Sequence, residues 1–537
     1  ASTSPGIAGE NGRYIYYTYQ TTLLYGDLMA KLNKSWDDFS LNAAIGTSIT
    51  DTRTSALRLD SKTASLYYPN VFTIANINMS SSAYIEESDD ARRQMQSFFA
   101  MAQLGYKESL YLDVTARNDW SSTLAFTERK SRGFFYPSVG LSWIIPKSFS
   151  MPSLISFGKV RASWSKVGND IPLFVSNTVG HIAAGGIPQP NDTAPFGTLK
   201  PEMSSSFEIG TEWKFFDYRM DVDLTFYKTN TKNQLFSLPS SAGAAYKYYF
   251  VNAGNIQNMG VELTFGAVPI LTNQFKWNTT LNFSRNKNEV KKLHDDLASF
   301  IQGDEGFSSS YTMRLVEGGS FGDIYGKAFE RDKYGAIVYG RDGLPQEIGS
   351  GNTAKVGNCN PAFLLGWGNS FTYKDFSFYF LIDGHFGGDV LAQTQAVLDQ
   401  TGVSKVSGET RTMGYVDLEG HHIYNIKGFY EQVGGRNGVT EYYMYDATNI
   451  RLRELSLGYT LPKRLLGRKQ FVKKAELSFV ARNLFFIYKK APFDPDAVLS
   501  ASNSNQGIDI FGIPTMMSSN EMSKPVPSSF ASSTGRL

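Results

Sequence analysis

Few residues of this chain have the types and spacing that catalysis requires, and the most suggestive are two carboxylates. Asp221 and Asp223 are two residues apart, so an extended strand would place both on one face with their carboxyl groups about 7 Å apart. That separation suits the carboxylate pair of an inverting glycosidase. A strand with one polar face produces the same spacing, however, and Lys159 and Arg161 repeat it. We therefore attribute the pair to strand patterning and predict that the protein is not an enzyme.

The histidines and the cysteine show no arrangement typical of a metal or cofactor site. The five histidines are His181, His294, His385, His421 and His422. They lack ligand spacing, and the single cysteine, Cys359, excludes both an internal disulfide and a cysteine-built metal site. No phosphate-binding loop, dinucleotide fingerprint or nucleophile elbow is present. We predict no metal and no cofactor, and the net charge of +2 gives no electrostatic argument for nucleic acid.

Aromatic and amide side chains gather where long loops are expected, and they are the candidates for contact with a substrate. The candidates are Trp120, Tyr246, Tyr248, Tyr249, Asn252, Tyr442 and Tyr443. A mouth that binds sugars or peptides uses aromatic faces and amides of this kind. Packing of each loop on itself would use the same residues, and the sequence leaves that alternative open for each of them.

The elements that must position these residues are segments in which apolar and polar side chains alternate with a period of two. We expect strands at 18–32, 37–52, 92–104, 107–119, 135–145, 156–167, 203–215, 219–235, 257–267, 275–287, 362–373, 376–388, 446–460 and 473–484. In one of them Leu112 and Val114 face one way, while Asp113 and Thr115 face the other. Each strand therefore has one apolar and one polar side.

The alternation slips once, inside 446–460. There the apolar set moves from Ile450 and Leu452 to Leu455 and Leu457. A β-bulge, or the exit of the strand from a membrane, would explain the slip.

The connections between these strands alternate in length along the whole chain. The short ones are 33–37, 104–107, 145–155, 215–219, 268–274, 374–375 and 461–471. The long ones are 53–91, 120–134, 168–202, 236–256, 288–361, 389–445 and 485–510. Short periplasmic turns and long extracellular loops are typical of an outer-membrane barrel. The sequence therefore predicts an all-β fold, a transmembrane antiparallel β-barrel of which about fourteen strands are present.

Tryptophan and charge agree with a barrel. Trp36, Trp143, Trp213 and Trp277 lie near short-turn ends, as in an interfacial aromatic girdle, with ordinary core packing as the alternative. The charged residues of the polar faces are Asp113, Arg117, Lys159, Arg161, Glu208, Glu212, Asp221, Asp223, Glu262 and Arg482. Burying so many charges in a core would cost several kcal/mol each unless they were paired. A water-filled lumen avoids that cost.

A series of strings along the chain carries a family resemblance. The strings are Arg117–Ser122, Phe135–Trp143, Lys159–Asn169, Leu199–Glu202, Phe207–Gly210, Asn255–Glu262, Ile450–Pro462, Ala481–Leu484 and Asp494–Asp496. In this order and spacing, over about residues 20–515, they resemble the SusC/RagA family of TonB-linked outer-membrane transporters of Bacteroidetes.

The resemblance implies a 22-stranded barrel with a plug domain, a TonB box and a SusD-like surface lipoprotein that acts as a lid. It implies import of oligosaccharides or peptides through the cell outer membrane, driven by the proton-motive force through TonB-ExbB-ExbD. Outer-membrane lipid would contact the apolar faces of the strands.

The chain departs from the family pattern at both ends. The residues from Ala1 do not have the pattern of a signal peptide, and we expect that Ala1 is not the natural start. We also expect the plug, the TonB box and about eight strands of the family barrel to lie outside the sequence given. The stretch from Met516 to Leu537 is serine-rich and does not alternate, where the family has a closing strand. We expect residues 1–515 to be the C-terminal portion of the receptor barrel and residues 516–537 to be an irregular tail outside the native barrel.

Two other classes of protein stay open at this point. A passive outer-membrane porin would conduct without TonB and without a lipoprotein partner. A secreted glycan-binding β-sandwich would be water-soluble. Coordinates in which Leu112, Leu224 and Phe283 meet a second protein layer would contradict the barrel.

Overall fold

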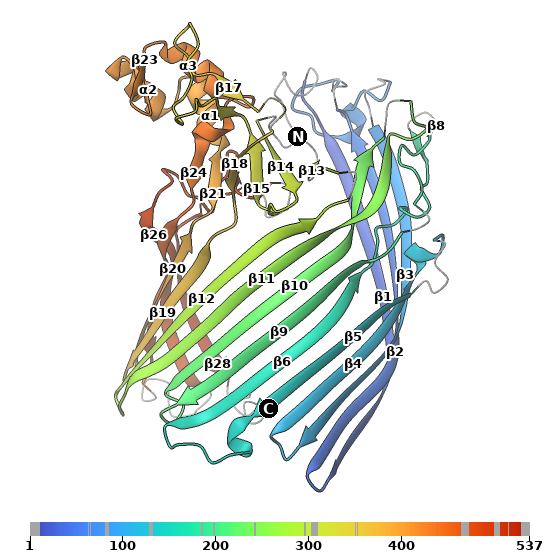
Figure 1. The fold of residues 1–537 in the computed structure, drawn as a ribbon, viewed down its shortest axis with the longest axis vertical. Coiled ribbons are helices and arrows are strands. Elements are labelled where there is room, and N and C mark those ends of the chain that lie inside the picture. The colour runs from blue at the N-terminus through green and yellow to red at the C-terminus, as the bar shows by residue number, and fades with distance from the viewer. Residues whose placement is uncertain are drawn as a thin grey trace. The chain divides into compact units, whose positions relative to one another are not determined.

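Antiparallel strands dominate the computed structural model. It describes residues 11–62, 64, 66–80, 85–127, 133–183, 186–196, 199–240, 243–294, 297–301, 310–349, 351, 353–462, 472–498, 505–513 and 515–527. The main sheet consists of β1 (Ile15–Trp36), β2 (Phe39–Asp60), β3 (Ile85–Tyr106), β4 (Leu110–Ser121), β5 (Gly133–Ile144), β6 (Ile155–Asn169), β9 (Glu202–Phe215), β10 (Met220–Pro239), β11 (Tyr248–Leu271), β12 (Phe275–Lys292), β19 (Phe363–Tyr373), β20 (Phe376–Phe386), β25 (Asn449–Thr460), β26 (Val472–Lys489) and β28 (Ser518–Pro527). These 15 strands are hydrogen-bonded to one another in the order in which they occur along the chain (Figure 1). Each of the predicted strands is found among them.

Short turns join alternate pairs of strands, as the sequence predicts. β1 pairs with β2 along its whole length, from Ile15 opposite Asp60 to Trp36 opposite Phe39. Asp37 in that turn, with φ 47°, and Lys374 between β19 and β20, with φ 52°, adopt the left-handed backbone that tight reversals use. Because the strands are antiparallel, the long connections leave from the opposite strand ends.

Contacts divide the chain into two compact units. The first unit contains Ala1–Trp143, Ala162–Phe207 and Thr229–Asn255. The second unit contains Ile144–Arg161, Glu208–Lys228 and Ile256–Leu537. The boundaries fall within β5, β6, β9, β10 and β11, so these five strands contribute to both units.

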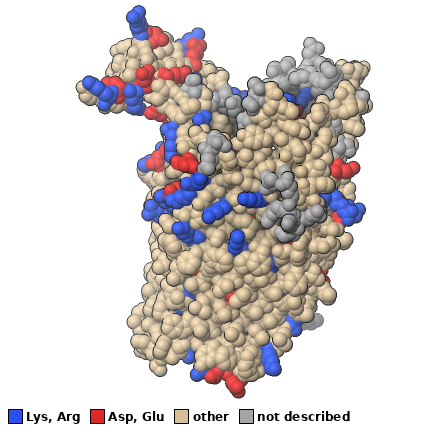
Figure 2. Space-filling view, turned by 45° about the vertical axis from the view of Figure 1, so that its right-hand side comes forward, with Lys and Arg blue, Asp and Glu red and all other residues tan. Residues whose placement is uncertain are grey.

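Large apolar side chains are exposed on one side of β4 and β10. Leu112 is 38% exposed, Val114 40% and Leu224 42%. Lys, Arg, Asp and Glu are sparse over much of the strand surface in Figure 2. An apolar, charge-poor outer face is the face that contacts hydrocarbon in a membrane barrel, so the arrangement that would contradict a barrel is not observed at these positions.

The slip in the alternation of β25 is a β-bulge. On β20, the consecutive residues Leu381 and Ile382 pair with Glu454 and Leu452, so Arg453 is the extra residue. The bulge turns Arg453 to the polar side, where its Nε lies 2.7 Å from Asp383. The bulge explanation for the sequence pattern is confirmed.

Tryptophans lie beside the short turns, as expected for a girdle. Trp36 ends β1 and is 41% exposed. Trp277, near the start of β12, stacks on Phe371 and donates from Nε1 to Asn369 Oδ1 at 3.0 Å. Its polar group is therefore satisfied while its ring stays on the apolar face of the sheet.

Smaller elements lie in the long connections. The strands are β7 (His181–Ala183), β8 (Ile187–Gln189), β13 (Ser299–Ile301), β14 (Tyr311–Val316), β15 (Asp323–Gly326), β16 (Ala328–Phe329), β17 (Glu347–Ile348), β18 (Ala354–Asn358), β21 (Asp389–Ala392), β22 (Val416–Leu418), β23 (His421–Ile423), β24 (Met444–Asp446) and β27 (Ile508–Asp509). The helices are α1 (Gln393–Gln400), α2 (Lys405–Met413) and α3 (Ile426–Val433), with 3₁₀ turns at Ile74–Asn76, Ser122–Leu124, Ile145–Lys147 and Thr440–Tyr443. Among the described residues, no helix is long and apolar enough to cross a membrane.

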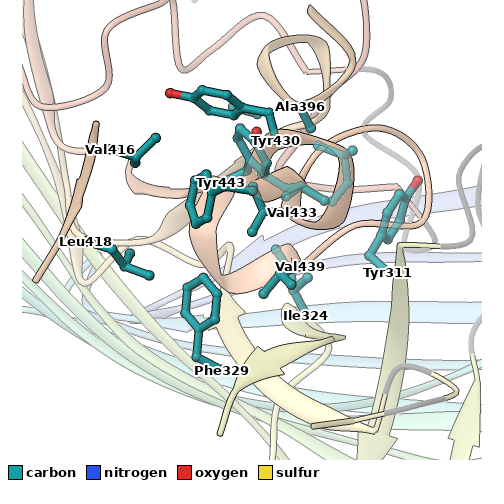
Figure 3. Close-up of a cluster of buried hydrophobic side chains, with 14 of the residues drawn as sticks. Tyr311, Ile324, Phe329, Ala396, Val416, Leu418, Tyr430, Val433, Val439 and Tyr443 are labelled. Atoms are coloured by element: carbon teal, nitrogen blue, oxygen red, sulfur yellow. The ribbon is translucent and has the colours of Figure 1, made fainter. Parts of the chain in front are cut away.

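Three connections of the second unit contribute to a compact loop domain with its own hydrophobic core. Members of the core include Tyr311 and Ile324 from the first connection and Phe429 and Val433 from α3 of the second (Figure 3). Side chains cap two of its helices: Ser404 Oγ accepts from Ser407 N at α2, and Asn425 Oδ1 accepts from Gly428 N at α3. The loop domain comprises residues 311–349, 351, 353–358, 389–447 and 505–510.

The tail departs from the irregular conformation expected for it. The backbone of β28 (Ser518–Pro527) pairs with β26 and forms the last strand of the main sheet. Backbone pairing requires no alternating side chains, which is why the sequence pattern gave no sign of this strand. Residues 528–537 lie outside the described part of the chain.

Candidate substrate-facing site

The tyrosines near the β10–β11 connection are exposed in the first unit. Tyr246 is 39% exposed, Tyr248 45% and Tyr249 41%. Tyr248 and Tyr249 begin β11 and so lie on a strand rather than in a loop as expected. Trp120 is 43% exposed and lies near the end of β4. These four residues are available for contact with a ligand.

Asn252, by contrast, holds its own chain together. Its Oδ1 accepts from Lys200 N at 2.5 Å, and its Nδ2 donates to Lys200 O at 2.7 Å and to Asn233 O at 2.9 Å. With both ends of the amide engaged by backbone, Asn252 serves as a clamp that joins β10 to the connection before β9. Its expected place among substrate-contacting loop residues is corrected, because it lies within β11 and its amide is already used.

Tyr442 and Tyr443 belong to the core of the loop domain. Tyr443 is 2% exposed, and its hydroxyl donates to Asp399 Oδ2 at 3.1 Å. Tyr442 packs edge-on against Phe429 with ring centroids 5.2 Å apart. Burial raises the pKa of both tyrosines above its ordinary range. Loop packing, the alternative that the sequence left open, describes these two residues.

In the first unit, the carboxylate of Asp170 links two of the strings that carry the family resemblance, Arg117–Ser122 and Lys159–Asn169. Asp170 accepts hydrogen bonds from Ser121 Oγ at 2.7 Å, from Thr123 Oγ1 at 2.6 Å and from the backbone N of Ile171 at 2.9 Å. Arg93 lies 3.7 Å from it. The string that ends at Ser122 is therefore tied to the connection that follows β6.

Charges on the polar faces of the strands are paired with neighbours. In the second unit, Arg161 makes two hydrogen bonds to Asp223, at 2.9 and 3.2 Å, and approaches Glu208 at 3.7 Å. Arg482 pairs with Glu454 at 3.0 Å. Asp223 is thus engaged in a cross-strand ion pair, which agrees with strand patterning rather than with a glycosidase pair.

A buried arginine joins two more strings in the second unit. Arg451 is 1% exposed, and its guanidinium contacts Asp494 at 2.8 Å and Asp496 at 3.1 Å. It also donates to Thr515 Oγ1 at 2.9 Å and lies 4.1 Å from the ring centre of Phe486. The Asp494–Asp496 segment is therefore tethered to β25, and the connection from β26 to β28 is fixed at this point.

The bulge residue Arg453 continues this network into a pocket. Its guanidinium lies 2.5 Å from Asp383 and 3.5 Å from Asp496. A pocket of about 470 Å³ opens beside it on the polar face, with Glu262, Asn282 and His385 among its lining residues. We call this the β19 pocket.

A glycine creates the hollow. Across the polar face, Asn282 of β12 lies opposite Gly366 of β19, which lies opposite Asp383 of β20. Gly366 puts no side chain between the two, and a Cβ added there would meet only Asn282 Cβ, at 3.9 Å. Within the described residues, Asp383 Oδ1 and His385 Nε2 are buried and have no hydrogen-bond partner.

A sheet with an apolar outer face, paired charges on its inner face and loops sorted by length defines an outer-membrane β-barrel protein. Residues 1–484 match the family model described as "TonB dependent receptor-like, beta-barrel". The chain belongs to this family. The predicted fold class and the predicted outer-membrane location are confirmed, and the soluble β-sandwich is excluded.

Known proteins similar to the chain are receptors of the predicted type. TonB-dependent receptor P3 of Formosa agariphila is 26% identical over 479 residues, 82% of this chain and 46% of that receptor. TonB-dependent receptor SusC of Bacteroides thetaiotaomicron is 22% identical over 460 residues, 77% of this chain and 43% of SusC. The structure of the RagAB peptide importer in the "open-open" state matches with a TM-score of 0.73 and 18% identity over 94% of this chain and 55% of that chain. The SusC/RagA resemblance is thereby confirmed, and the chain spans about half the length of these relatives.

The β19 pocket was not predicted, although its residues lie on strands that were. Asp383 and His385 are two residues apart, which is the polar-face period of β20, and Gly366 occupies the same face of β19. The one sequence feature that could have indicated the pocket was a glycine, Gly366, on the polar face of a strand between two strands that carry polar side chains. Only the register between β12, β19 and β20 brings these residues together.

Proposed function

We propose that the chain forms part of the barrel wall of a TonB-dependent transporter that imports oligosaccharides or peptides. Its polar faces would line the substrate path, and its long connections would form the mouth. No catalytic step is proposed, since the family is one of receptors and transporters. The barrel portion would include residues 1–515, as the sequence predicts, and also β28, which pairs with β26 in the same sheet.

One observation carries this proposal: the polar side of the sheet holds paired charges and a pocket that is open to solvent. Glu262 is exposed on this side, and the β19 pocket lies near the ends of β19, β20 and β25 from which long connections leave. A wall that only sealed a membrane would need no such pocket. A polar pocket in the lumen is what a solute binds on its way through.

Energy coupling is tested by uptake. Cells that carry the complete receptor are given labelled oligosaccharides and labelled oligopeptides of matched size, with and without a functional TonB. We expect uptake of one of the two classes, and its loss when TonB is absent. Uptake that persists without TonB would instead identify a passive porin.

A SusD-like lipoprotein lid and the TonB-ExbB-ExbD complex are the proposed partners. The long connections support the first, because the loop domain presents a folded surface at the mouth end of the second unit's strands. Affinity purification of the receptor from outer membranes is expected to recover a surface lipoprotein in equal amount. Recovery of the receptor alone, from membranes that contain the lipoprotein, would contradict the lid.

A further inference from the structure

The β19 pocket holds more hydrogen-bond acceptors than the protein uses. Both short contacts from Arg453 go to Oδ2 of Asp383, which leaves Oδ1 buried and without a partner in the described structure. A buried carboxylate oxygen with no donor is costly, because desolvation is not offset by a hydrogen bond. The oxygen is therefore suited to a donor that comes from outside the chain.

A second acceptor lies on the same strand face. His385 is two residues from Asp383 and interacts with the backbone of Gly387, while its Nε2 is buried and without a partner among the described residues. A neutral imidazole with one nitrogen engaged as donor presents the other as an acceptor. Along the strand the two acceptors are about 7 Å apart, within the span of one small polar group and its neighbours.

The negative charge of the pocket lining favours a cationic hydrogen-bond donor over a neutral one. Its lining contains three carboxylates, Glu262, Asp383 and Asp496, and one arginine, Arg453. Arg453 is already shared between Asp383 and Asp496, whereas Glu262 has no ion pair among the described residues and is exposed to the pocket. The uncompensated charge is negative, and an ammonium group has three donors and no acceptor.

The access to these acceptors depends on Gly366. Any larger side chain at this position would project between Asn282 and Asp383, while the nearest atom to an added Cβ is 3.9 Å away. The hollow is therefore created by the missing side chain and can be filled without displacing the wall.

We propose that the β19 pocket is a subsite for a primary ammonium group of the imported solute. This inference rests on the proposed function and narrows its substrate class to amine-bearing molecules. The ammonium donates to Asp383 Oδ1, a second N–H or O–H group of the same solute donates to His385 Nε2, and Glu262 supplies the opposing charge. Two sources of the group fit: the amino end or lysine of a peptide, and the free amine of an amino sugar.

The test uses two pairs of probes that differ only in acetylation. One pair is a penta-alanine amide with a free or an acetylated amino end, and the other is a chitosan pentamer and its acetylated form, a chitin pentamer. Binding to the purified full chain in detergent is measured by isothermal titration calorimetry. We expect at least one amine to bind about tenfold or more tightly than its acetylated partner, the effect of a charge-assisted hydrogen bond. The pair that shows the preference identifies the source.

Variants assign the preference to the pocket. Asp383→Asn and Gly366→Leu are expected to abolish it, and Gly366→Leu does so without removing a charge. Matched controls are Glu212→Gln, a wall carboxylate paired with Lys214 at 3.2 Å, and Gly140→Leu, whose added Cβ would lie 3.7 Å from Asp113. Both controls should keep the preference. Folding of every variant is checked by its heat-modifiable mobility on gels.

Three results would overturn the inference. They are equal binding of both members in both pairs, no binding of either amine at millimolar concentration, and a preference that survives Gly366→Leu and Asp383→Asn. Failure of the proposed function gives a different result, since uptake would then be independent of TonB while the amine preference in detergent would remain.

Discussion

At the scale of single residues, the wall of this barrel relies on a few side chains with low exposure and several partners. Arg451 is 1% exposed and binds two carboxylates. A buried ion pair gains little over an apolar pair of the same shape, but removal of one partner leaves the other charge uncompensated. The charges of Asp494 and Asp496 are therefore compensated by Arg451, although it lies more than forty residues away in the sequence.

Replacement of this arginine should release the connection between β26 and β28. In Arg451→Met, Asp494 is left buried without its cation, which costs about 3 kcal/mol or more and raises the open population of the connection roughly hundredfold. Trypsin cleavage after Lys489 or Lys490 measures the opening. Arg482→Met is the control, because the Arg482–Glu454 pair is exposed and should contribute less than about 1 kcal/mol. Equal cleavage of the two variants would contradict the tether.

The reactivity of the single cysteine, Cys359, measures the burial of a site in the second unit, which also contains Arg451. Burial raises the pKa of the Cys359 thiol to about 11, and the nearby Asp323 and Asp389 carboxylates act in the same direction. Because the thiolate is the reactive form, maleimide labelling of the folded chain at pH 8 should be about a hundredfold slower than in guanidinium, where the pKa returns to about 8.5. The folded rate should rise about tenfold per pH unit from 7 to 9. Mass spectrometry follows it, and similar rates in both states would show that the thiol is not buried.

At the scale of elements, the loop domain has a hydrophobic core to which the strands of the main sheet contribute no residue among those described. Phe429 of α3 is fully buried, with Tyr430 and Tyr442 packed edge-on against it. Its members come from three connections, which lie between β12 and β19, between β20 and β25, and between β26 and β28. The domain should therefore lose stability independently of the sheet.

Truncation of this core separates the two parts. Phe429→Ala should lower the stability of the loop domain by about 3–5 kcal/mol, while the sheet keeps its heat-modifiable mobility. Proteolysis within 389–447 is expected to increase strongly. Val403→Ala is the control, since Val403 is 69% exposed and should change stability by less than about 0.5 kcal/mol. Loss of heat-modifiable mobility in Phe429→Ala would mean that wall and domain fold as one unit.

Sequence alone could predict the elements but not all of their partners. Period-two alternation predicted the fourteen strands, and the shift from Leu452 to Leu455 located the bulge, because side-chain direction in a strand follows from position along it. Asn252 and Tyr443 were assigned to a binding mouth, although one is a clamp and the other a core residue, because exposure of a loop side chain depends on contacts distant in sequence. The pairing of Arg451 with Asp494 and the hollow at Gly366 could not be predicted for the same reason. They arise from tertiary packing and from the register of neighbouring strands.

At the scale of the whole molecule, the two sides of the sheet contact different solvents. Val114 and Thr115 are neighbours in β4 at nearly the same depth, and they lie on opposite faces. Val114 is 40% exposed on the apolar face. The same new charge at these two positions therefore distinguishes lipid from water directly.

Lysine at the two positions should have unequal effects. Val114→Lys places an ammonium in hydrocarbon and should lower the free energy of unfolding in a bilayer by about 2–4 kcal/mol if it lies near the midplane. Thr115→Lys faces the lumen and should cost less than about 1 kcal/mol. Folding into lipid vesicles, followed by heat-modifiable mobility across a denaturant series, measures both. A larger loss for Thr115→Lys would reverse the assignment of the faces.

The bulge at Arg453 has a consequence for how such walls change over time. One additional residue in β25 exchanges the sides of every residue beyond it, while Leu381 and Ile382 of the neighbouring strand keep their places. A single-codon insertion or deletion at a bulge can therefore move an arginine side chain from the lipid-facing side of the strand to the lumen-facing side, or the reverse, in one step. Pore chemistry in this fold can thus evolve through changes in length as well as through substitutions.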